Sequence, residues 1–484
     1  MNAATWPSQQ SSGRLPVICE MSKFKMPMTG RTRATFLVAA FWLVLQFVAV
    51  PFASAQQRIP IVRDAEIEAL VRDYARPVLR AAGLGKTGVD IVLVNDAGFN
   101  AFVAGRRIFI NTGALMTAET PNEIIGVLAH EAGHLAGGHQ ERLRAQIARA
   151  RTMAVVSTLL GIGASVGGAL TDNGGLARSG GGIALAGAEL ARRGLLGYQR
   201  TEESSADRLA LTYLERTGQS ARGMLKTFER FASALALTGS RVDPYQISHP
   251  MPRERIANLK TLAEKSPHFN KQDPASLQLR HDLMRAKIAA HTSGPAATAR
   301  LFRANPRSLG ALYGDAINTH LRGRPRDALA KVDALIAKQP NNAYFHELRG
   351  DVLIRANQSG PAAKAYARAR KLDGSKSSII QISYGQALLA AGDEKSTREA
   401  VRQISQALDR DRENPDGYML LGQAQGRLGN IGEAELASAE MHYYAGSYDQ
   451  ARIFAARAQQ KLKRGSPAWV RAQDIINAKP PGRK

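Results

Sequence analysis

Residues 129–134 read Ala-His-Glu-Ala-Gly-His, and the interpretation of the whole chain starts from this stretch. Four residues make slightly more than one helical turn, so in a helix His130 and His134 project from the same face. Two imidazoles at that spacing can bind one zinc ion, and Glu131 beside them can take a proton from an attacking water molecule. The alternative is a buried helix that carries two histidines by chance, and the motif by itself leaves both open.

The residues before the motif predict that it lies on a helix. Thr120-Pro121-Asn122-Glu123 has the form of a capping box with proline at the first helical position. An apolar stretch follows, made of Ile124, Ile125, Val127 and Leu128. We therefore expect a helix that begins at Pro121 and contains the motif.

The composition limits the partners and the metal ligands. The 484 residues are enough for two or three domains, and the net charge is +24 with a pI near 10.4. Such a charge favours anionic surfaces, such as lipid headgroups or acidic proteins. Nucleic acid is not expected as a partner, because no nucleic-acid-binding motif accompanies the widely spread basic residues. The one cysteine, Cys19, lies in the N-terminal segment, so the mature chain would have no thiolate zinc site and a metal must use histidine and carboxylate ligands.

The first 55 residues have the pattern of a secretory signal peptide. Residues 34–50 are strongly apolar, basic residues precede them, and Ala53-Ser54-Ala55 matches the cleavage pattern of small residues. We expect cleavage after Ala55. An uncleaved membrane anchor is the alternative, but the apolar run is short for a span. A cleaved signal on a mature chain without cysteine fits the bacterial periplasm.

Two strands are predicted before the motif, at residues 89–94 and 107–110, where β-branched and aromatic residues gather. A strand just before a metal-binding helix commonly forms the edge that an extended substrate joins by backbone pairing. An ordinary core hairpin explains the pattern equally well.

The motif needs a third metal ligand, and His139 is the nearest histidine. On a straight helix His139 would lie about half a turn away from His130, since nine residues at roughly 100° each return to about 180°. We therefore place His139 outside the ligand set, in a structural or supporting role.

Two carboxylates downstream are better candidates. Glu203 and Asp207 are four residues apart near the start of a helix predicted from about residue 200 to 217, so they share one face. One carboxylate can bind the metal while the other orients a histidine ring. The alternative is an acidic first turn that complements the helix dipole, which accounts for Glu202 but not for Asp207.

Residues 153–197 form a glycine-rich, apolar insert between the two motifs. Each half, 153–166 and 183–196, is predicted to be a helix, and neither has the roughly 20 uninterrupted apolar residues of a membrane span. We predict a mobile hairpin or a lid over the site that contacts a membrane or a membrane-protein client. A packed helical pair with glycine at close contacts is the rival interpretation.

Beyond about residue 263 the chain is alanine-rich and helical, with a repeat of 34 residues from Asn305-Pro306 to Gln339-Pro340 and on to Gly374. This is the period of tetratricopeptide repeats. Small residues recur where the helices of a repeat would cross closely, at Gly314, Gly350, Gly385 and Gly422. We predict an all-α tetratricopeptide-repeat solenoid of four to five helix pairs within residues 263–475, which binds protein segments, and a flexible tail at residues 476–484.

The motifs together resemble a known family. The H-E-x-x-H helix, Arg200 three residues before Glu203, and the upstream segments Asn100-Ala101-Phe102 and Thr112-Gly113 are similar to the gluzincin metallopeptidases of the HtpX and CAAX-prenyl-endopeptidase type. The resemblance covers roughly residues 60–262 and is to a soluble periplasmic form with repeats. It implies an α+β zincin-like domain at residues 56–262, mostly helical with a small sheet. It also implies one Zn²⁺ per chain, bound by His130, His134 and Glu203, with Asp207 as the supporting carboxylate.

The resemblance extends to Ser248-His249-Pro250 and the following Arg255. It implies that His249 faces the open zinc position, where it stabilises the oxyanion or binds the metal and keeps the enzyme latent. From the residues alone, His249 reads as a turn histidine before proline. Arg255 is expected to fix local structure rather than to touch substrate.

We therefore expect a secreted zinc metalloendopeptidase with Glu131 as its catalytic base. As the resemblance implies, its clients are misfolded or unassembled envelope and outer-membrane proteins, bound by the repeats, and its partners include the outer-membrane assembly machinery. The alternative is a chiefly non-proteolytic periplasmic chaperone or assembly scaffold with a latent zinc site.

Overall fold

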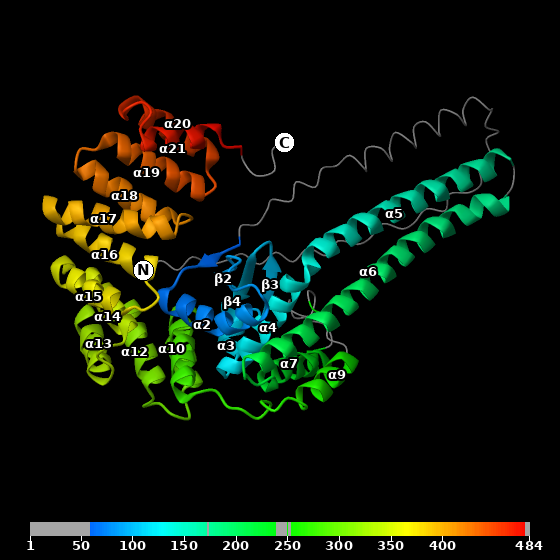
Figure 1. The fold of residues 1–484 in the computed structure, drawn as a ribbon, viewed down its shortest axis with the longest axis horizontal. Helices are drawn as coiled ribbons and strands as arrows, with labels where there is room; N and C mark the ends of the chain where they lie inside the picture. Colours follow the sequence, from blue (N-terminus) through cyan, green and yellow to red (C-terminus); the bar gives the residue numbers. More distant parts are fainter. Residues whose placement is uncertain (1–58, 172–173, 239–248, 250–252, 480–484) are drawn as a thin grey trace, which may run out of the picture. The chain divides into compact units, whose positions relative to one another are not determined.

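The computed structural model describes residues 59–171, 174–238, 249 and 253–479, and the expected signal peptide and Cys19 lie outside this part of the chain. The described residues are mostly helical, with one small sheet near the start (Figure 1). This confirms the predicted fold class of a mostly helical α+β domain followed by an all-α region.

A four-stranded mixed sheet supports the first domain. Its strands are β1 (Ile61–Val62), β2 (Asp90–Val94), β3 (Ala101–Ala104) and β4 (Arg107–Asn111). They lie in the order β1-β2-β4-β3, with β2 and β4 parallel and the other pairs antiparallel. The strand that directly precedes the motif, β4, is therefore internal, and the two edge strands are β1 and β3. The expectation that the preceding strand forms the edge is wrong, because β4 pairs on both sides.

The helix with the motif is α4 (Pro121–Gly137), and it begins at the predicted residue. Thr120 is its N-cap residue, but the Thr120 side chain makes no capping hydrogen bond to the backbone. Instead, its hydroxyl donates to Glu123 Oε1 at 3.4 Å, and the same oxygen accepts the Glu119 N–H at 3.2 Å. The reciprocal capping box is therefore wrong, although the helix start that it predicted is confirmed.

Helix α4 lies at the centre of the domain, in contact with α2 (Ala65–Ala81), α6 (Gly174–Arg216) and α7 (Arg222–Thr238). Every residue of α4 from Pro121 to Gly133 is buried. Glycine allows the close approach of two neighbours. A Cβ at Gly126 would lie 2.6 Å from Met224 Cβ of α7, and one at Gly133 would lie 2.8 Å from the Ala206 carbonyl oxygen of α6.

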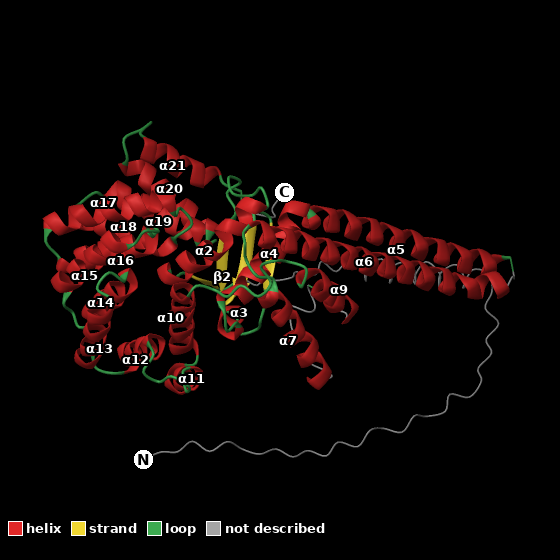
Figure 2. Cartoon of the chain, turned by 60° about the horizontal axis from the view of Figure 1, so that its bottom comes forward, coloured by secondary structure: helices red, strands yellow, loops and turns green. Residues whose placement is uncertain are grey.

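The insert forms a long helical hairpin, in which α5 (His139–Leu170) and α6 run side by side (Figures 1 and 2). Both helices are much longer than the predicted halves, and α6 continues without a break through residues 200–207. The predicted helix start near residue 200 is wrong, and Glu202 is not in a first turn. A Cβ at Gly187 would lie 1.9 Å from Ser157 Oγ, so glycine does mark a close contact of the packed pair.

The apolar side chains of the hairpin are exposed, with Val155, Leu159 and Leu160 at 58%, 62% and 61%. A helix whose side chains were covered by the domain would not show such exposure, so the described part of the hairpin is not a lid packed on the site. By length and composition, residues His139–Gly167 could cross a membrane, which for a single helix is weak evidence of a span.

Helix α9 (Arg253–Ala263) completes the first domain, and twelve helices follow as consecutive neighbours (Figure 2). They are α10 (Ala275–Thr292), α11 (Gly294–Leu301), α12 (Leu309–Arg322), α13 (Pro325–Lys338), α14 (Ala343–Arg355), α15 (Ser359–Leu372), α16 (Ser378–Ala391), α17 (Glu394–Arg410), α18 (Pro415–Arg427), α19 (Ile431–Tyr444), α20 (Tyr448–Lys461) and α21 (Pro467–Asn477). Residues 275–477 thus hold six helix pairs, more than the predicted four to five. The first domain also contains the short helix α3 (Thr112–Thr117).

The predicted close crossings within the repeats are present at three of the four glycines. A Cβ at Gly314 would lie 2.4 Å from Thr298, one at Gly350 2.7 Å from Tyr366, and one at Gly385 2.4 Å from Ile404. At Gly422 the nearest atom would be 3.4 Å away, an ordinary contact. The small residues therefore mark close helix crossings at Gly314, Gly350 and Gly385 but not at Gly422.

The first domain and the repeats meet at the start of α2. Lys287 of α10 lies 2.7 Å from Asp64 and 3.4 Å from Glu66, and the Tyr313 hydroxyl of α12 donates to Glu66 Oε2 at 2.8 Å. Arg63 binds both carboxylate oxygens of Asp411, at 2.9 and 3.2 Å. Part of the repeat surface that was expected to bind clients is therefore covered by the start of α2 and the residues before it.

A further carboxyl group, that of Glu347 of α14, lies close to this junction, and its burial disfavours the ionised form. Glu347 is 8% exposed, and its Oε2 has no hydrogen-bond partner among the described residues. Burial raises the pKa of Glu347 well above its ordinary value, against the opposing effect of Lys287. The folded chain therefore favours the protonated acid.

We expect Glu347→Gln to stabilise the chain relative to the parent at pH 8, with the gain vanishing below about pH 4. A raised folded-state pKa contributes stability that is present below the unfolded pKa and lost as the pH rises through the folded value, and glutamine has no proton to lose. Chemical denaturation at both pH values measures this. Glu254→Gln, at an exposed position on α9, is the control. An equal effect of Glu347→Gln at the two pH values would show that Glu347 is already ionised in the fold.

Candidate metal centre

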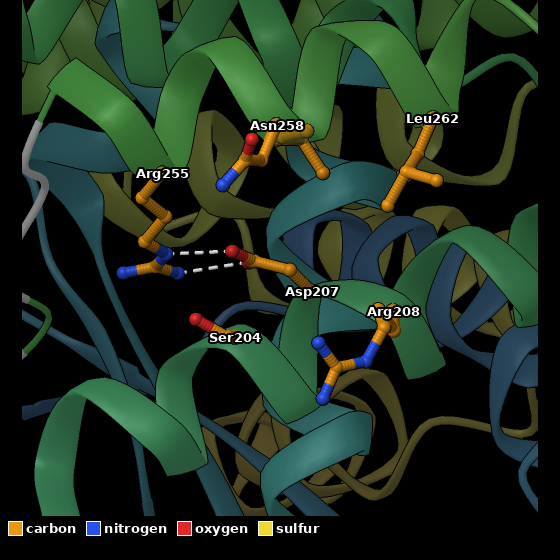
Figure 3. Close-up of a pocket in the computed structure, with 7 residues that line it drawn as sticks. Ser204, Asp207, Arg208, Arg255, Asn258 and Leu262 are labelled. Carbon is orange, nitrogen blue, oxygen red and sulfur yellow. Dashed lines mark hydrogen bonds and ion pairs between the residues drawn. The ribbon is translucent and has the colours of Figure 1, made fainter.

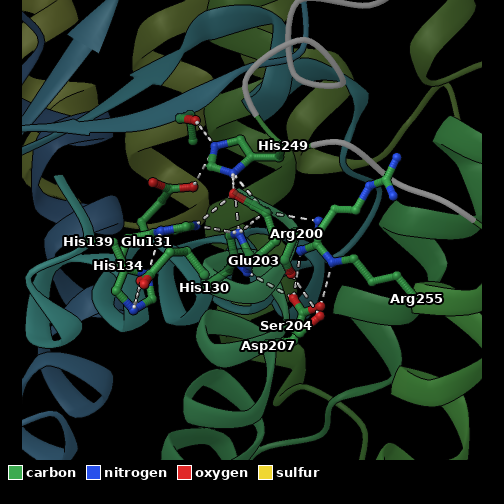
Figure 4. A network of polar contacts seen from close by, with 12 residues as sticks. His130, Glu131, His134, His139, Arg200, Glu203, Ser204, Asp207, His249 and Arg255 are labelled. Atoms are coloured by element: carbon green, nitrogen blue, oxygen red, sulfur yellow. Dashed lines mark hydrogen bonds and ion pairs between the residues drawn. The ribbon is translucent and has the colours of Figure 1, made fainter. Parts of the chain in front are cut away.

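Four side chains from three parts of the chain converge at the end of α4 (Figure 4). They are His130 and His134 of α4, Glu203 of α6, and His249 from the segment before α9, and one donor atom of each lies within 4.8 Å of the others. The two Nε2 atoms of His130 and His134 are 3.0 Å apart, and Glu203 lies 3.3 Å from each of the two histidines. Glu203 is 5% exposed and His130 is fully buried.

The donor set fits a metal ion. Three imidazoles and one carboxylate are the ligands that zinc accepts when no thiolate is present. Buried polar groups are normally hydrogen-bonded, yet neither oxygen of Glu131 has a hydrogen-bond partner among the described residues. A buried carboxylate of this kind, next to converging imidazoles, is typical of a site that acts on a ligand or on water. His130, His134, Glu203 and His249 are therefore placed to hold a metal.

Glu131 lies on α4 beside His130 and is fully buried. Burial raises the pKa of Glu131 above its ordinary value, and the nearby imidazoles of His249 and His130 act in the opposite direction. A raised pKa brings a carboxyl closer to the range in which it can take a proton and release it again.

Asp207 and Arg255 support the cluster from behind. Asp207 Oδ1 lies 3.0 Å from His130 Nδ1, the nitrogen that faces away from the cluster. Arg255 donates two hydrogen bonds to Asp207, at 2.6 and 2.8 Å, and its third nitrogen lies 2.9 Å from Glu203. Burial raises the pKa of Asp207, but the hydrogen bonds from Arg255 outweigh it and leave the pKa lowered. Asp207 is therefore ionised and holds the His130 ring.

The Arg255–Asp207 pair also forms one wall of a small hollow behind the cluster (Figure 3). The hollow is lined by Ser204, Asp207, Arg208, Arg255, Asn258, Leu259 and Leu262. Arg255 was expected to fix local structure, and these contacts agree with that. Its ion pair with Glu203 was not foreseen, because no local pattern relates α9 to α6.

His139 lies next to the cluster, although a straight helix would have carried it to the far side. Helix α4 ends at Gly137, Gly138 adopts the left-handed conformation with φ 64°, and α5 begins at His139. The turn brings His139 Nδ1 to 2.9 Å from His134 Nδ1, on the side away from the other donors. The assumption of a straight helix is therefore wrong, while the placement outside the four converging donors agrees with the structure. The glycine pair at 137–138 was the sequence signal for this bend.

His249 lies between the cluster and the edge of the sheet. Its Nδ1 is 3.1 and 3.2 Å from the two oxygens of Glu203, and its Nε2 is 3.3 Å from the carbonyl oxygen of Ala101 on β3. The same ring is 3.5 Å from Glu131 Oε1. The histidine that only the family resemblance singled out is thus in contact with the other candidate residues.

Two family descriptions match the chain. Residues 62–263 match peptidase family M48, and residues 322–376 and 384–450 match the tetratricopeptide repeat. The first range contains the whole cluster, from His130 to Arg255. The second falls on α12 to α20 of the helical repeats.

The chain is also similar over most of its length to known proteins. It is 24% identical to the beta-barrel assembly-enhancing protease of Escherichia coli K12 over 423 residues, which cover 84% of this chain and 82% of the relative. It is 26% identical to the putative beta-barrel assembly-enhancing protease of Vibrio cholerae, over 94% of this chain and 92% of the relative. The metalloprotease YcaL of Escherichia coli is 33% identical over 148 residues, which cover 30% of this chain and 51% of YcaL. The chain is therefore a metallopeptidase with a peptidase family M48 domain, followed by tetratricopeptide repeats.

Proposed function

We propose that the chain is a zinc metalloendopeptidase of the bacterial periplasm that cleaves misfolded or unassembled envelope proteins, including outer-membrane proteins. The observation that carries the peptidase proposal is the convergence of His130, His134 and Glu203 beside Glu131. His249 connects this cluster to the edge strand β3. The names of two relatives, which refer to β-barrel assembly, support the client class. The predicted signal peptide, with cleavage expected after Ala55, supports the compartment.

Each residue of the cluster has a defined task in this proposal. His130, His134 and Glu203 hold the zinc ion, and when bound the ion polarises the scissile carbonyl and acidifies water. Glu131 takes the proton of the attacking water and delivers it to the leaving amine. Asp207 and Arg255 keep His130 and Glu203 in place. Strand β3, at the edge of the sheet, offers backbone groups with which an extended client segment pairs.

The repeats are proposed to bind the client chains. Residues 63–66 contact α10, α12 and the end of α17, so the client surface lies on the repeat helices that these residues leave uncovered. A repeat solenoid attached to a peptidase domain raises the local concentration of bound clients near the site.

We expect Glu131→Gln to bind one zinc ion per chain but to cleave an unfolded protein substrate roughly 10²- to 10⁴-fold more slowly, because the proton acceptor is lost and the proposed metal ligands remain. Metal analysis and a gel-based cleavage assay measure the two properties. Glu141→Gln, at an exposed position on α5, is the matched control. Unchanged cleavage by Glu131→Gln would contradict the assignment of the activity to this site. Full rescue of the envelope defects of a deletion strain by Glu131→Gln would favour the chaperone alternative.

The contacts of His249 favour a latent form of the site, and with it the chaperone alternative. His249 lies against Glu203 and the β3 carbonyl of Ala101, where a client segment on the edge strand would approach the metal. A fourth protein ligand closes a zinc site that catalysis needs open. We propose that His249 binds the metal in the resting chain and leaves it when a client enters.

We expect His249→Ala to raise the cleavage rate of an unfolded protein several-fold while the chain still binds one zinc ion, because three ligands remain and the fourth position opens. Cleavage and zinc content are measured as above, and His268→Ala, outside the cluster, is the control. A fall in cleavage at full zinc content would show that His249 acts on the reacting carbonyl instead. Loss of zinc would show that it is a required ligand.

The exposed hairpin is proposed to contact an anionic membrane surface. Residues 152–167 of α5 contain no charged side chain, and their apolar residues are exposed. The exposed arginines Arg149 and Arg151 of α5, with Arg192 and Arg193 of α6, lie on the domain side of this apolar part. Apolar surface with flanking basic residues is the composition that binds the interface of anionic membranes.

We expect the parent chain to co-sediment with vesicles of anionic phospholipid in a salt-sensitive manner, and Leu159→Asp with Leu160→Asp to reduce this binding at least roughly tenfold, because two exposed apolar contacts become charged. Val470→Asp, at a position that is 45% exposed on α21, is the control. Equal binding by the double variant and the parent would exclude the hairpin as the membrane contact.

A further inference from the structure

We propose that His139 is a positioning residue for the metal ligand His134, and that Glu202 and Arg142 hold it in this role from the base of the hairpin. The inference rests on the metal site proposed above. It concerns residues that lie outside the four converging donors and that the proposed reaction does not use.

The two nitrogens of His134 face different partners. Nε2 lies 3.0 Å from His130 Nε2 and 3.3 Å from Glu203 Oε1, so it is the nitrogen directed at the donor cluster. Nδ1 is the outer nitrogen, and it lies 2.9 Å from His139 Nδ1 with the two rings nearly perpendicular, at 87°. Since only a nitrogen without a proton binds a metal, the contact at Nδ1 decides whether Nε2 is available.

Glu202 fixes which nitrogen of His139 carries the proton. Glu202 Oε2 lies 2.8 Å from His139 Nε2, and an ionised carboxylate only accepts hydrogen bonds. His139 Nε2–H is therefore the donor to Glu202, and in the neutral ring Nδ1 is left as an acceptor. That acceptor takes the Nδ1–H of His134, which leaves His134 Nε2 with a free lone pair for the metal.

Arg142 keeps Glu202 in place. Arg142 Nη2 lies 2.7 Å from the same Oε2 that faces His139, and Arg142 Nε donates to the Tyr198 hydroxyl at 3.2 Å. Arg142 belongs to α5, whereas Glu202 and Tyr198 belong to α6. These contacts therefore join α5 and α6 at the base of the hairpin, next to His139.

The local sequence allows this fold-back only with glycine. Gly138 has φ 64°, in the left-handed region that other residues rarely adopt. A Cβ at Gly137 would lie 2.3 Å from His139 Nε2, so any side chain there would displace the imidazole. Gly137 and Gly138 thus place the His139 ring on the outer nitrogen of His134.

The arrangement parallels the one at the other ligand histidine. His130 has its outer Nδ1 3.0 Å from Asp207, which Arg255 holds. At His134, the outer Nδ1 contacts His139, which in turn contacts Glu202. Arg142 pairs with Glu202. Each ligand imidazole is therefore held by a carboxylate and an arginine, and at His134 one additional imidazole lies between. Partners of this kind typically contribute 10- to 100-fold to metal affinity.

The test compares zinc affinity among variants by competition with a chromophoric chelator. His139→Phe keeps the ring volume but removes the acceptor, and we expect it to weaken zinc binding by about 10- to 100-fold. His139→Asn places an amide oxygen near the position of Nδ1 and should recover the affinity to within a few-fold of the parent. Glu141→Gln, an exposed position in the same turn, should bind zinc like the parent.

A double-variant comparison separates positioning from simple packing. Glu202→Leu should also weaken zinc binding, and His139→Phe combined with Glu202→Leu should bind zinc no more weakly than His139→Phe alone, because both changes break the same chain of hydrogen bonds. The visible absorption bands of the cobalt-substituted chain should shift in His139→Phe and return in His139→Asn.

Three results would overturn the inference. Parent-like zinc affinity of His139→Phe would exclude the role of His139, and additive losses in the double variant would exclude the coupling to Glu202. If His139→Phe fails to fold by circular dichroism, parent-like affinity of Glu202→Leu overturns the proposal instead. A parent chain that binds no zinc would contradict the proposed function itself, which is a separate outcome.

Discussion

The close packing of α4 against α6 is the interaction on which the rest of the metal centre depends. A Cβ at Gly133 would lie 2.8 Å from the Ala206 carbonyl oxygen, and Ala206 is fully buried. With these two small residues at the crossing, Glu203 on α6 comes within 3.3 Å of both histidines on α4, and Asp207 one turn later reaches His130. A larger residue at either position would separate the helices and with them the donors.

This packing buries several charges at once, and the chain balances them with arginine. Glu203 and Asp207 are each 5% exposed, and Arg255 contacts both. An isolated buried carboxylate would be strongly unfavourable, because burial costs several kcal/mol per ion in real proteins. At the base of the hairpin, Glu202 is likewise paired with an arginine, Arg142. In this network Glu202, Glu203 and Asp207 each lie beside an arginine, and His130 and His134 each have a partner at the outer nitrogen.

Helix α6 joins two features that would otherwise be unrelated. One continuous helix of 43 residues runs from the far end of the exposed hairpin to Glu203 and Asp207. The hairpin that we propose to contact membranes therefore shares one helix with Glu203, the proposed metal ligand, and with Glu202, which contacts His139. At the other side of the domain, the start of α2 meets the repeats through Asp64 and Glu66. Ion pairs with Lys287 and a hydrogen bond from Tyr313 thus join the peptidase domain to its proposed client-binding scaffold.

The sequence by itself determined the features that depend on local spacing. Four-residue intervals place His130 with His134 and Glu203 with Asp207 on shared helix faces, proline marks the start of α4, and the 34-residue period predicts the repeats. Only the tertiary structure decided that β3 is an edge strand and β4 is not, that α6 runs unbroken through Glu202, and that His139 turns back onto His134. The physical reason is the same in each case. Strand order, helix continuity and the direction of a chain after a glycine turn are set by packing between segments far apart in sequence, and local patterns of residues carry no record of those contacts.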